Sequence, residues 1–324
     1  STNRLLIPSI CSMILSAHRI GKSYGEQTVL YPLDLQVNAG EKLGIIGETG
    51  SGKTTLLRSL AGLVQLDQGS VFFQEERVLG PAEKLLPGHP SIAYLSQSVD
   101  LRNQYRVRDL LELNSILDLK DDAVLAKLCR IDHLMDRMTD QLSGGERQRI
   151  GLAIALAKKP RVLLLDEPFS NLDIGHRNTL RAILDDLHDN LKLTLLIISH
   201  NPTEILGWAD RIVVMRAGQC VQTGTSEQIY TEPIDEYVAQ LLGPYNLTPN
   251  SISNQSRITR PENFWLQQEQ ETGWNGMIVK KEFEGSSTLY TVLTDLGTIQ
   301  VRTIDGALTI GQKVSILEIE NHAK

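Results

Sequence analysis

The sequence predicts an α/β fold followed by a small all-β domain. Three observations lead to this prediction. A glycine-rich turn joins an apolar run, 42–46, to a helical pattern, 56–61. Two later apolar runs, 161–165 and 194–199, end directly in acidic or imidazole side chains. Beyond residue 261 the pattern changes to short alternating runs separated by glycine turns, which is typical of antiparallel strands.

Composition indicates a globular chain with room for one large domain and a smaller one, or for two domains. Of its 324 residues 41% are hydrophobic and 22% are charged, and the formal net charge is -7. This mild acidity argues against nucleic acid as a partner, because phosphate backbones select basic surfaces. Cys11, Cys129 and Cys220 are far apart in the sequence, which indicates neither a disulfide framework nor a zinc site.

The beginning of the chain has two interpretations. Residues 5–17 loosely resemble the apolar region of a signal peptide. Alternatively, residues 1–12 are an N-terminal extension and the first strand begins at Met13. We favour the extension, because the nucleotide site argued below needs the compartment in which nucleotide is found. No apolar run approaches the ~20 residues that cross a bilayer, so we expect no membrane-spanning segment.

Residues 14–37 alternate between apolar and polar side chains, with turn signals at Gly21 and Gly25, and predict antiparallel strands. Tyr24 lies on the second turn. Its ring is suited to stacking on a base, but a single tyrosine in a hairpin is as often a packing residue. From the residues alone both roles remain open.

The stretch GETGSGKTT at 47–55 fits the pattern G-x-x-x-x-G-K-[ST] between a strand and a helix. Consecutive backbone N–H groups in such a turn form a concave anion site, and the helix directs its positive end at the same point. We expect Lys53 to reach the β- and γ-phosphates and the hydroxyl of Thr54 to bind Mg²⁺. The predicted contacts to ATP or GTP are Gly47, Glu48, Thr49, Gly50, Ser51, Gly52, Lys53, Thr54 and Thr55.

A strand over 91–97 ends in Gln97, and a helical lobe is predicted after it, at about 98–158. A single glutamine after a strand is usually an ordinary polar residue at the strand end, so a functional role for Gln97 depends on the residues around it. Leucines and isoleucines between 107 and 138 recur at helical spacing, and most of them should be core.

The second strong signal is QLSGGERQR at 141–149, which continues into a helix that Pro160 ends. Ser143, Gly144 and Gly145 therefore lie at a helix N-terminus, a second site suited to an anion. The alternative is a capping box between Ser143 and Glu146, which needs no ligand. Both interpretations can hold together.

The third signal is a buried strand at 161–165 that ends in Asp166 and Glu167. In open α/β sheets ligands bind at this end of the strands. Successive strand residues point to opposite sides, so we expect one acid to face Mg²⁺ and the other to accept a proton from an attacking water. The strand at 194–199 similarly ends in His200.

The order of these motifs, with SNLD at 170–173, resembles the ATPase subunit of an ABC transporter. The resemblance implies an ABC-type phosphate-loop fold with an antiparallel β subdomain and a helical subdomain. It also implies a head-to-tail pair of chains, in which each ATP lies between one phosphate loop and the partner's Ser143 to Glu146. The implied roles are general base for Glu167, γ-phosphate and Mg²⁺ sensors for His200 and Gln97, a metal ligand for Asp166, a cross-subunit contact for Asp173 and an adenine platform for Tyr24.

The resemblance also implies partners. A permease of separate chains would dock on the helical lobe, and we expect the contact at residues 99–108. The sequence at 209–243 resembles the corresponding stretch of importers that work with a solute-binding protein. We therefore expect a peripheral ATPase on the cytoplasmic face of the inner membrane that energises import of an inorganic anion, a metal ion or a polyamine. The alternatives are an exporter or lipid-extracting complex, and a non-transport binding switch.

The expected domains are an ATPase domain at 13–243, a linker at 244–260 and an accessory domain at 261–324. Residues 244–260 are rich in Asn, Ser, Thr and Pro. Four short β runs follow, at 277–283, 288–293, 298–303 and 314–319, and suggest a small oligonucleotide/oligosaccharide-binding (OB) type barrel. The barrel would either add dimer surface or bind a regulator or the transported ion, and the short tail disfavours a sugar importer.

Overall fold

The computed structural model describes residues 13–116, 119–249, 256–268, 273–295 and 297–319. The extension expected at 1–12, with Cys11, lies outside these residues. The chain forms two compact units, Ser1–Ser226 and Glu227–Lys324. Within the described ranges, no helix is both long and apolar enough to cross a membrane.

The first unit is built on a six-stranded sheet of order β10-β9-β3-β8-β7-β6. From β9 to β6 neighbouring strands run parallel, and β10 is antiparallel to β9. Every side chain of β7 and β8 is buried, which is why these strands read as unbroken apolar runs. The strands are β3 (Lys42–Ile46), β6 (Ile92–Leu95), β7 (Val162–Asp166), β8 (Thr194–Ser199), β9 (Arg211–Arg216) and β10 (Gln219–Gly224).

A second, antiparallel sheet has the order β2-β1-β4-β5, which confirms the expected β subdomain. It consists of β1 (Met13–Tyr24), β2 (Gln27–Asn38), β4 (Gln68–Phe73) and β5 (Glu76–Val78). Helix α1 (Lys53–Leu60) lies between the two sheets. One buried cluster holds the three together, with members such as Leu15 of β1, Leu57 of α1 and Leu196 of β8.

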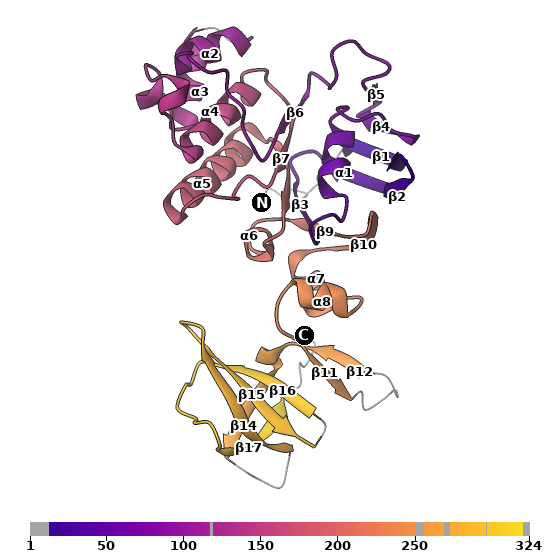
Figure 1. Cartoon of the computed structure of the whole chain (residues 1–324), viewed down its shortest axis with the longest axis vertical. Coiled ribbons are helices and arrows are strands. Elements are labelled where there is room, and N and C mark those ends of the chain that lie inside the picture. The colour runs from indigo at the N-terminus through magenta and orange to yellow at the C-terminus, as the bar shows by residue number, and fades with distance from the viewer. Residues whose placement is uncertain (1–12, 117–118, 250–255, 269–272, 296, 320–324) are drawn as a thin grey trace, which may run out of the picture. The chain divides into compact units, whose positions relative to one another are not determined.

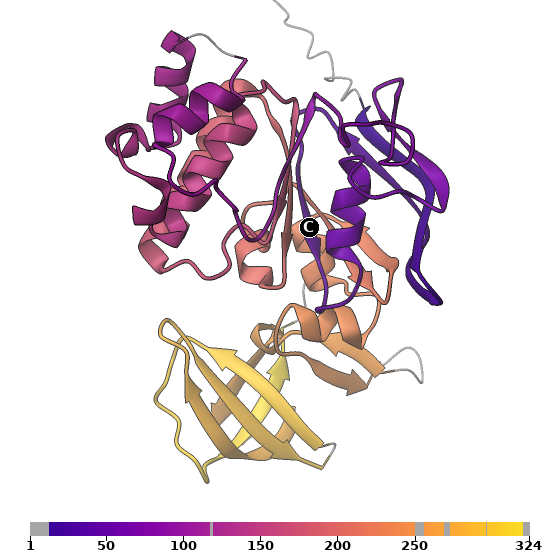
Figure 2. The ribbon, with the colours of Figure 1, turned by 45° about the horizontal axis from the view of Figure 1, so that its top comes forward.

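The remaining helices of the first unit gather on the other side of the parallel sheet (Figures 1 and 2). They are α2 (Val107–Asn114), α3 (Leu119–Leu128), α4 (Gly144–Leu156) and α5 (Ile174–Leu191), with the short turns η1 (Asp132–Leu134), η2 (Thr139–Gln141) and α6 (Pro202–Leu206). The predicted helical lobe is therefore present. Leu110, Leu111 and Leu125 are core as expected, whereas Leu113 and Ile116 are exposed.

The second unit contains a five-stranded antiparallel sheet of order β13-β17-β14-β15-β16. It has its own buried cluster, which includes Phe264, Ile278 and Tyr290. This confirms an all-β C-terminal part, while its assignment to the OB type stays a prediction. The elements are α7 (Ser226–Thr231), α8 (Glu236–Leu241), β11 (Asn246–Pro249), β12 (Ser256–Thr259), η3 (Pro261–Asn263), β13 (Phe264–Gln268), β14 (Trp274–Phe283), β15 (Thr288–Thr294), β16 (Gly297–Thr303) and β17 (Lys313–Glu318).

The division between the units lies earlier than the sequence suggested, at residue 226 and not at 243. Arg260 explains why α7 and α8 belong to the second unit. Its guanidinium is buried and donates hydrogen bonds to backbone carbonyls in and after the two helices. The acceptors are the carbonyl oxygens of Tyr230, Ala239, Gly243 and Pro244.

The stretch expected to be a linker, 244–260, contains the paired strands β11 and β12. Its polar side chains are used inside the unit. Thr248 and Thr259 share a buried hydrogen bond of 3.0 Å between their hydroxyls. The side chain of Asn246 exchanges two hydrogen bonds of 2.7 Å with the backbone of Gln300. The polar residues of this stretch therefore include buried groups with hydrogen-bond partners. Composition alone cannot distinguish such a stretch from a linker.

Candidate functional site

The glycine-rich turn lies between β3 and α1, where the sequence placed it. Gly50 and Gly52 have φ values of 83° and 95°, in the left-handed region that favours glycine. At Gly52 a Cβ atom would also lie 2.7 Å from the carbonyl oxygen of Val29, which it could not do without displacing backbone. The turn thus requires its glycines for conformation and for close packing.

Lys53 lies inside this turn, with 5% of its surface exposed. Its Nζ donates hydrogen bonds to the carbonyl oxygens of Gly47 (2.8 Å) and Glu48 (2.7 Å) and to Ser51 Oγ (3.3 Å). Burial lowers the pKa of Lys53, while the carboxylates of Glu167 and Asp166 oppose that shift. The loop carbonyls therefore hold the Lys53 ammonium group at the centre of the phosphate loop.

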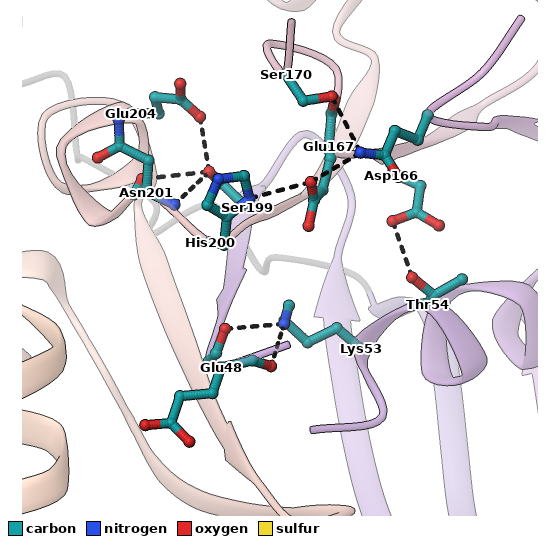
Figure 3. Close-up of polar contacts among 12 residues, drawn as sticks. Glu48, Lys53, Thr54, Asp166, Glu167, Ser170, Ser199, His200, Asn201 and Glu204 are labelled. Atoms are coloured by element: carbon teal, nitrogen blue, oxygen red, sulfur yellow. Dashed lines mark hydrogen bonds and ion pairs between the residues drawn. The ribbon is translucent and has the colours of Figure 1, made fainter. Parts of the chain in front are cut away.

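Asp166, at the end of β7, faces the first turn of α1. Its Oδ1 accepts a hydrogen bond from Thr54 Oγ1 at 3.1 Å (Figure 3). Its Oδ2 accepts one from Tyr94 OH at 2.9 Å. Burial raises the pKa of Asp166, although both hydroxyls stabilise its charged form. Tyr94, on β6, is a site residue that the sequence analysis missed.

The oxygens of Thr54 and Asp166 fit a magnesium site. Mg²⁺ takes oxygen ligands and is usually held by one or two protein groups together with substrate phosphates. Among the described residues no three His, Cys, Asp or Glu side chains come together as a metal cluster. A pair of protein oxygens matches the one or two protein ligands with which Mg²⁺ is usually held beside substrate phosphates.

Glu167 turns away from Asp166 and meets two other predicted site residues (Figure 3). Its Oε2 accepts a hydrogen bond from Gln97 Nε2 at 3.1 Å and lies 3.0 Å from Nδ1 of His200. The backbone of Glu167 has a φ of 48°, which is sparsely populated by residues with a Cβ and is typical of functional sites. Its N–H donates to the carbonyl of Ile198, and Ser170 Oγ donates to its carbonyl at 2.8 Å.

A cavity of about 220 Å³ opens beside Glu167, and Gln97, His200 and Glu204 are among its lining residues. A hydrogen-bond network supports the segment that carries His200. Ser199 Oγ donates to Glu204 Oε2 at 2.6 Å and accepts from the N–H of Asn201 at 2.9 Å. No sequence pattern predicts this support, because its members are ordinary polar residues at a strand end.

Ser143 and Glu146 form the capping box expected for α4. Ser143 Oγ accepts from the N–H of Glu146 at 3.3 Å, and Glu146 Oε2 accepts from the N–H of Ser143 at 2.8 Å. The hydrogen bond from the Ser143 backbone lowers the pKa of Glu146. These residues sit on the helical lobe, an element separate from the one that carries the phosphate loop (Figure 1). The second anion site therefore stays a prediction.

Asp173 and Tyr24 also lie outside the cluster around Lys53 and Glu167. Asp173 caps α5 by accepting the N–H of His176 at 2.8 Å. The ring of Tyr24 is 52% exposed at the end of β1, with Lys22 Nζ at 5.2 Å from its centroid. Such exposure argues against the packing interpretation of this tyrosine.

Comparisons with known proteins agree with this geometry. A family model described as ABC transporter matches residues 30–170. The sulfate/thiosulfate import ATP-binding protein CysA of Nitrosomonas europaea is 40% identical over 245 residues, which cover 72% of this chain and 67% of that protein. Its counterpart in Pectobacterium atrosepticum is 34% identical over 276 residues, 83% of each chain.

Solved structures show the same fold. An ATP-binding cassette of an ABC transporter in its ADP conformation has a TM-score of 0.61 and 25% identity, and the match covers 71% of this chain and 98% of that one. A nucleotide-free cassette gives a TM-score of 0.59 with 25% identity, over 71% and 95% of the two chains.

Proposed function

Because this chain belongs to the ABC transporter family, as an ATP-hydrolysing import subunit, we propose that it energises uptake of sulfate or a related inorganic oxyanion. The observation that carries the ATPase proposal is the meeting of Glu167, Gln97 and His200 beside the Thr54–Asp166 pair. The oxyanion is supported by the names of the relatives, which are sulfate/thiosulfate import proteins. This proposal selects the inorganic anion from the three classes of solute expected from the sequence, which were an inorganic anion, a metal ion and a polyamine.

In the proposed mechanism the loop residues 47–55 hold the phosphates of ATP. Lys53 Nζ exchanges loop carbonyls for phosphate oxygens, a small displacement because it already lies within the loop. Thr54, Asp166 and Gln97 would hold Mg²⁺, which supplies positive charge against the β- and γ-phosphates. A cation held there would stabilise the buried charge of Asp166.

Glu167 is proposed as the general base. Gln97 and His200 both contact Oε2 of Glu167, so the carboxylate is oriented before ATP binds. Glu167 takes a proton from a water whose oxygen forms a bond to the γ-phosphorus, while the bond to the bridging oxygen of ADP breaks. ADP and inorganic phosphate are the products. His200 and Gln97 also contact the γ-phosphate side of the site in this proposal.

A second copy of the chain would complete the site. Its helix α4 presents Ser143, Gly144, Gly145 and Glu146 to the phosphates, its Asp173 makes a cross-subunit contact, and Tyr24 of the first copy stacks on adenine. The free N–H groups of a helix N-terminus favour such an anion. A Cβ on Gly144 would meet no atom within 4 Å, so the space on that side of the residue is open.

The permease is proposed to dock on the helical lobe, around residues 99–108. Tyr105 in this segment and the nearby Leu113 and Ile116 are exposed apolar side chains. Exposed apolar surface of this kind is typical of protein interfaces. The chain would then act on the cytoplasmic face of the inner membrane, indirectly served by a solute-binding protein. The OB-type accessory domain keeps both proposed roles, as dimer surface or as a regulator or ion site.

The test combines hydrolysis, dimer formation and transport in Glu167→Gln. We expect hydrolysis to fall by about 10²- to 10⁴-fold, because the amide cannot accept the proton. ATP binding should persist, and sedimentation with ATP and Mg²⁺ should show a stable dimer. Lys53→Ala is the matched control, since it should lose ATP binding and remain monomeric.

Transport is measured as uptake of labelled sulfate by cells that lack the chain. The parent should restore uptake and Glu167→Gln should not. A Glu167→Gln chain that hydrolyses ATP at the parental rate would refute the catalytic proposal. Uptake that stays normal without the chain, while uptake of a metal ion or polyamine fails, would refute the oxyanion.

A further inference from the structure

His176, in the first turn of α5, contacts two of the segments predicted to face a second copy of the chain. Its Nδ1 lies 2.8 Å from Oδ2 of Asp173, and its backbone N–H donates to Oδ1 of the same carboxylate at 2.8 Å. On the other side the imidazole packs on Gly145 of α4. A Cβ built on Gly145 would lie 2.4 Å from Cδ2 of His176 and 2.7 Å from Cγ.

The two adjacent glycines of α4 therefore have different reasons to be glycine. At Gly144 an added Cβ would meet nothing within 4 Å, so this position faces open space. At Gly145 the space is filled by a side chain of the same protomer, the imidazole of His176. Only Gly144 is left open for approach by a ligand, while Gly145 is required for packing between α4 and α5.

Both oxygens of Asp173 are occupied by one residue. The backbone hydrogen bond from His176, followed by the one from its imidazole, lowers the pKa of Asp173, so this carboxylate is held charged and fixed. A proton on Nδ1 serves as the donor, which directs the other ring nitrogen away from Asp173. The ring is thereby oriented by Asp173 while its carbon edge rests on Gly145.

We propose that His176 is a positioning residue that holds the Ser143–Gly145 turn and Asp173 as one rigid group, so that the turn meets the second copy's nucleotide and Asp173 its cross-subunit contact together. This inference rests on the proposed function, because it assumes that the two segments act across a dimer. Without the imidazole, the turn at the start of α4 and the segment before α5 lose their shared contact. Each would then have to be ordered separately when the dimer closes, and that cost reduces catalysis without affecting the phosphate loop.

Two substitutions in the full chain separate the hydrogen bond from the packing. His176→Leu fills similar space but donates nothing to Asp173. His176→Asn retains a donor at the position of Nδ1, so it should rescue the contact. Both leave the backbone cap of α5 intact, and we therefore expect parental unfolding midpoints.

The readouts are the kinetics of ATP hydrolysis and the binding of a fluorescent ATP analogue to dilute protomers. We expect His176→Leu to lower kcat/KM by about tenfold, the size typical of a lost hydrogen bond to a charged group, and His176→Asn to restore most of it. Analogue binding should be parental in both. Parental kcat/KM in His176→Leu, equal loss in His176→Asn, or weakened analogue binding would each overturn the inference.

A double-substitution cycle tests the contact with Gly145. Gly145→Ala should slow hydrolysis because its methyl group displaces the imidazole, and the loss should be smaller in a His176→Ala background, where the space is empty. Additive losses would overturn the packing argument. Glu167→Gln is measured in parallel. If both Glu167→Gln and His176→Leu hydrolyse ATP at the parental rate, the proposed function fails. If Glu167→Gln is slow and His176→Leu hydrolyses ATP at the parental rate, only the inference about His176 fails.

Discussion

At the scale of single residues, Asp166 shows what the site costs the folded chain. The carboxylate is buried between two hydroxyls, and burial raises its pKa. A carboxyl group with a raised pKa in the folded state stabilises the fold at low pH and loses that contribution as pH rises through the raised value. Ionisation of Asp166 in the nucleotide-free protein is therefore disfavoured by the fold.

We predict that Asp166→Asn increases the free energy of unfolding at pH 7 by roughly 1 kcal/mol, a typical gain when a functional residue is relaxed. Asparagine does not ionise, so the gain should shrink as pH falls toward 3.8, the ordinary pKa of the carboxyl group. Urea unfolding at several pH values measures it. The variant should also bind ATP less tightly with Mg²⁺ than the parent does. A gain that grows toward low pH would contradict the prediction.

The residues around Lys53, Thr54, Asp166, Glu167 and His200 could be predicted as neighbours because each follows or ends a parallel strand, and such ends meet at one edge of a sheet. Tyr94 could not. It pairs with Leu164 on β7, and only this register brings its hydroxyl to Asp166. Strand register between segments about 70 residues apart is not written in the local sequence. The supporting role of Ser199 and Glu204 was missed because both are ordinary polar residues at and just after a strand end.

At the scale of elements, Ser143 at the start of α4 has one role in stability and a second, proposed role in function, and substitutions can distinguish the two. Ser143 caps the helix and is also predicted to contact a second copy's phosphates. We predict that Ser143→Ala lowers the free energy of unfolding by about 1 kcal/mol through loss of the cap. Ser143→Asp should retain the cap but reduce hydrolysis by about 100-fold, since its carboxylate would repel the γ-phosphate across the dimer.

Urea unfolding and ATPase rates measure the two effects separately. Parental hydrolysis by Ser143→Asp would show that no phosphate approaches this turn. The capping box itself was readable from sequence, because Ser and Glu three residues apart precede an apolar run. Strand β13 was not, because its segment FWLQQ lacks alternation. Phe264 alone of this strand is buried, and its partner β17 lies about 50 residues later.

At the scale of the whole molecule, each compact unit has a buried cluster of its own. We predict two transitions in scanning calorimetry, one for each unit. Tyr290→Ala should lower only the transition of the second unit, by about 3–5 kcal/mol of stability, and leave ATP hydrolysis unchanged. Leu196→Ala, in the β8 strand of the first unit, is the matched control and should lower the other transition by about 2–5 kcal/mol.

Binding of ADP with Mg²⁺ should raise only the transition that Leu196→Ala lowers, by about 2.7 kcal/mol at a hundredfold excess over Kd. A single transition that both substitutions lower equally would mean that the units unfold as one. The two-part organisation was visible in the sequence as a change of pattern, but its boundary was not. The contacts of Arg260 decide the boundary, and a single arginine carries no such information in its local context.

Those contacts also determine where the protein can be cut and rejoined. Exchange of C-terminal parts between related ATPases would, from sequence alone, be made at residue 243, where the ATPase domain was expected to end and the polar stretch begins. That junction would leave a buried guanidinium facing carbonyls contributed by a foreign sequence at Tyr230, Ala239 and Gly243. A splice before α7 transfers Arg260 together with the carbonyl groups that accept its hydrogen bonds, so the buried guanidinium keeps its native partners.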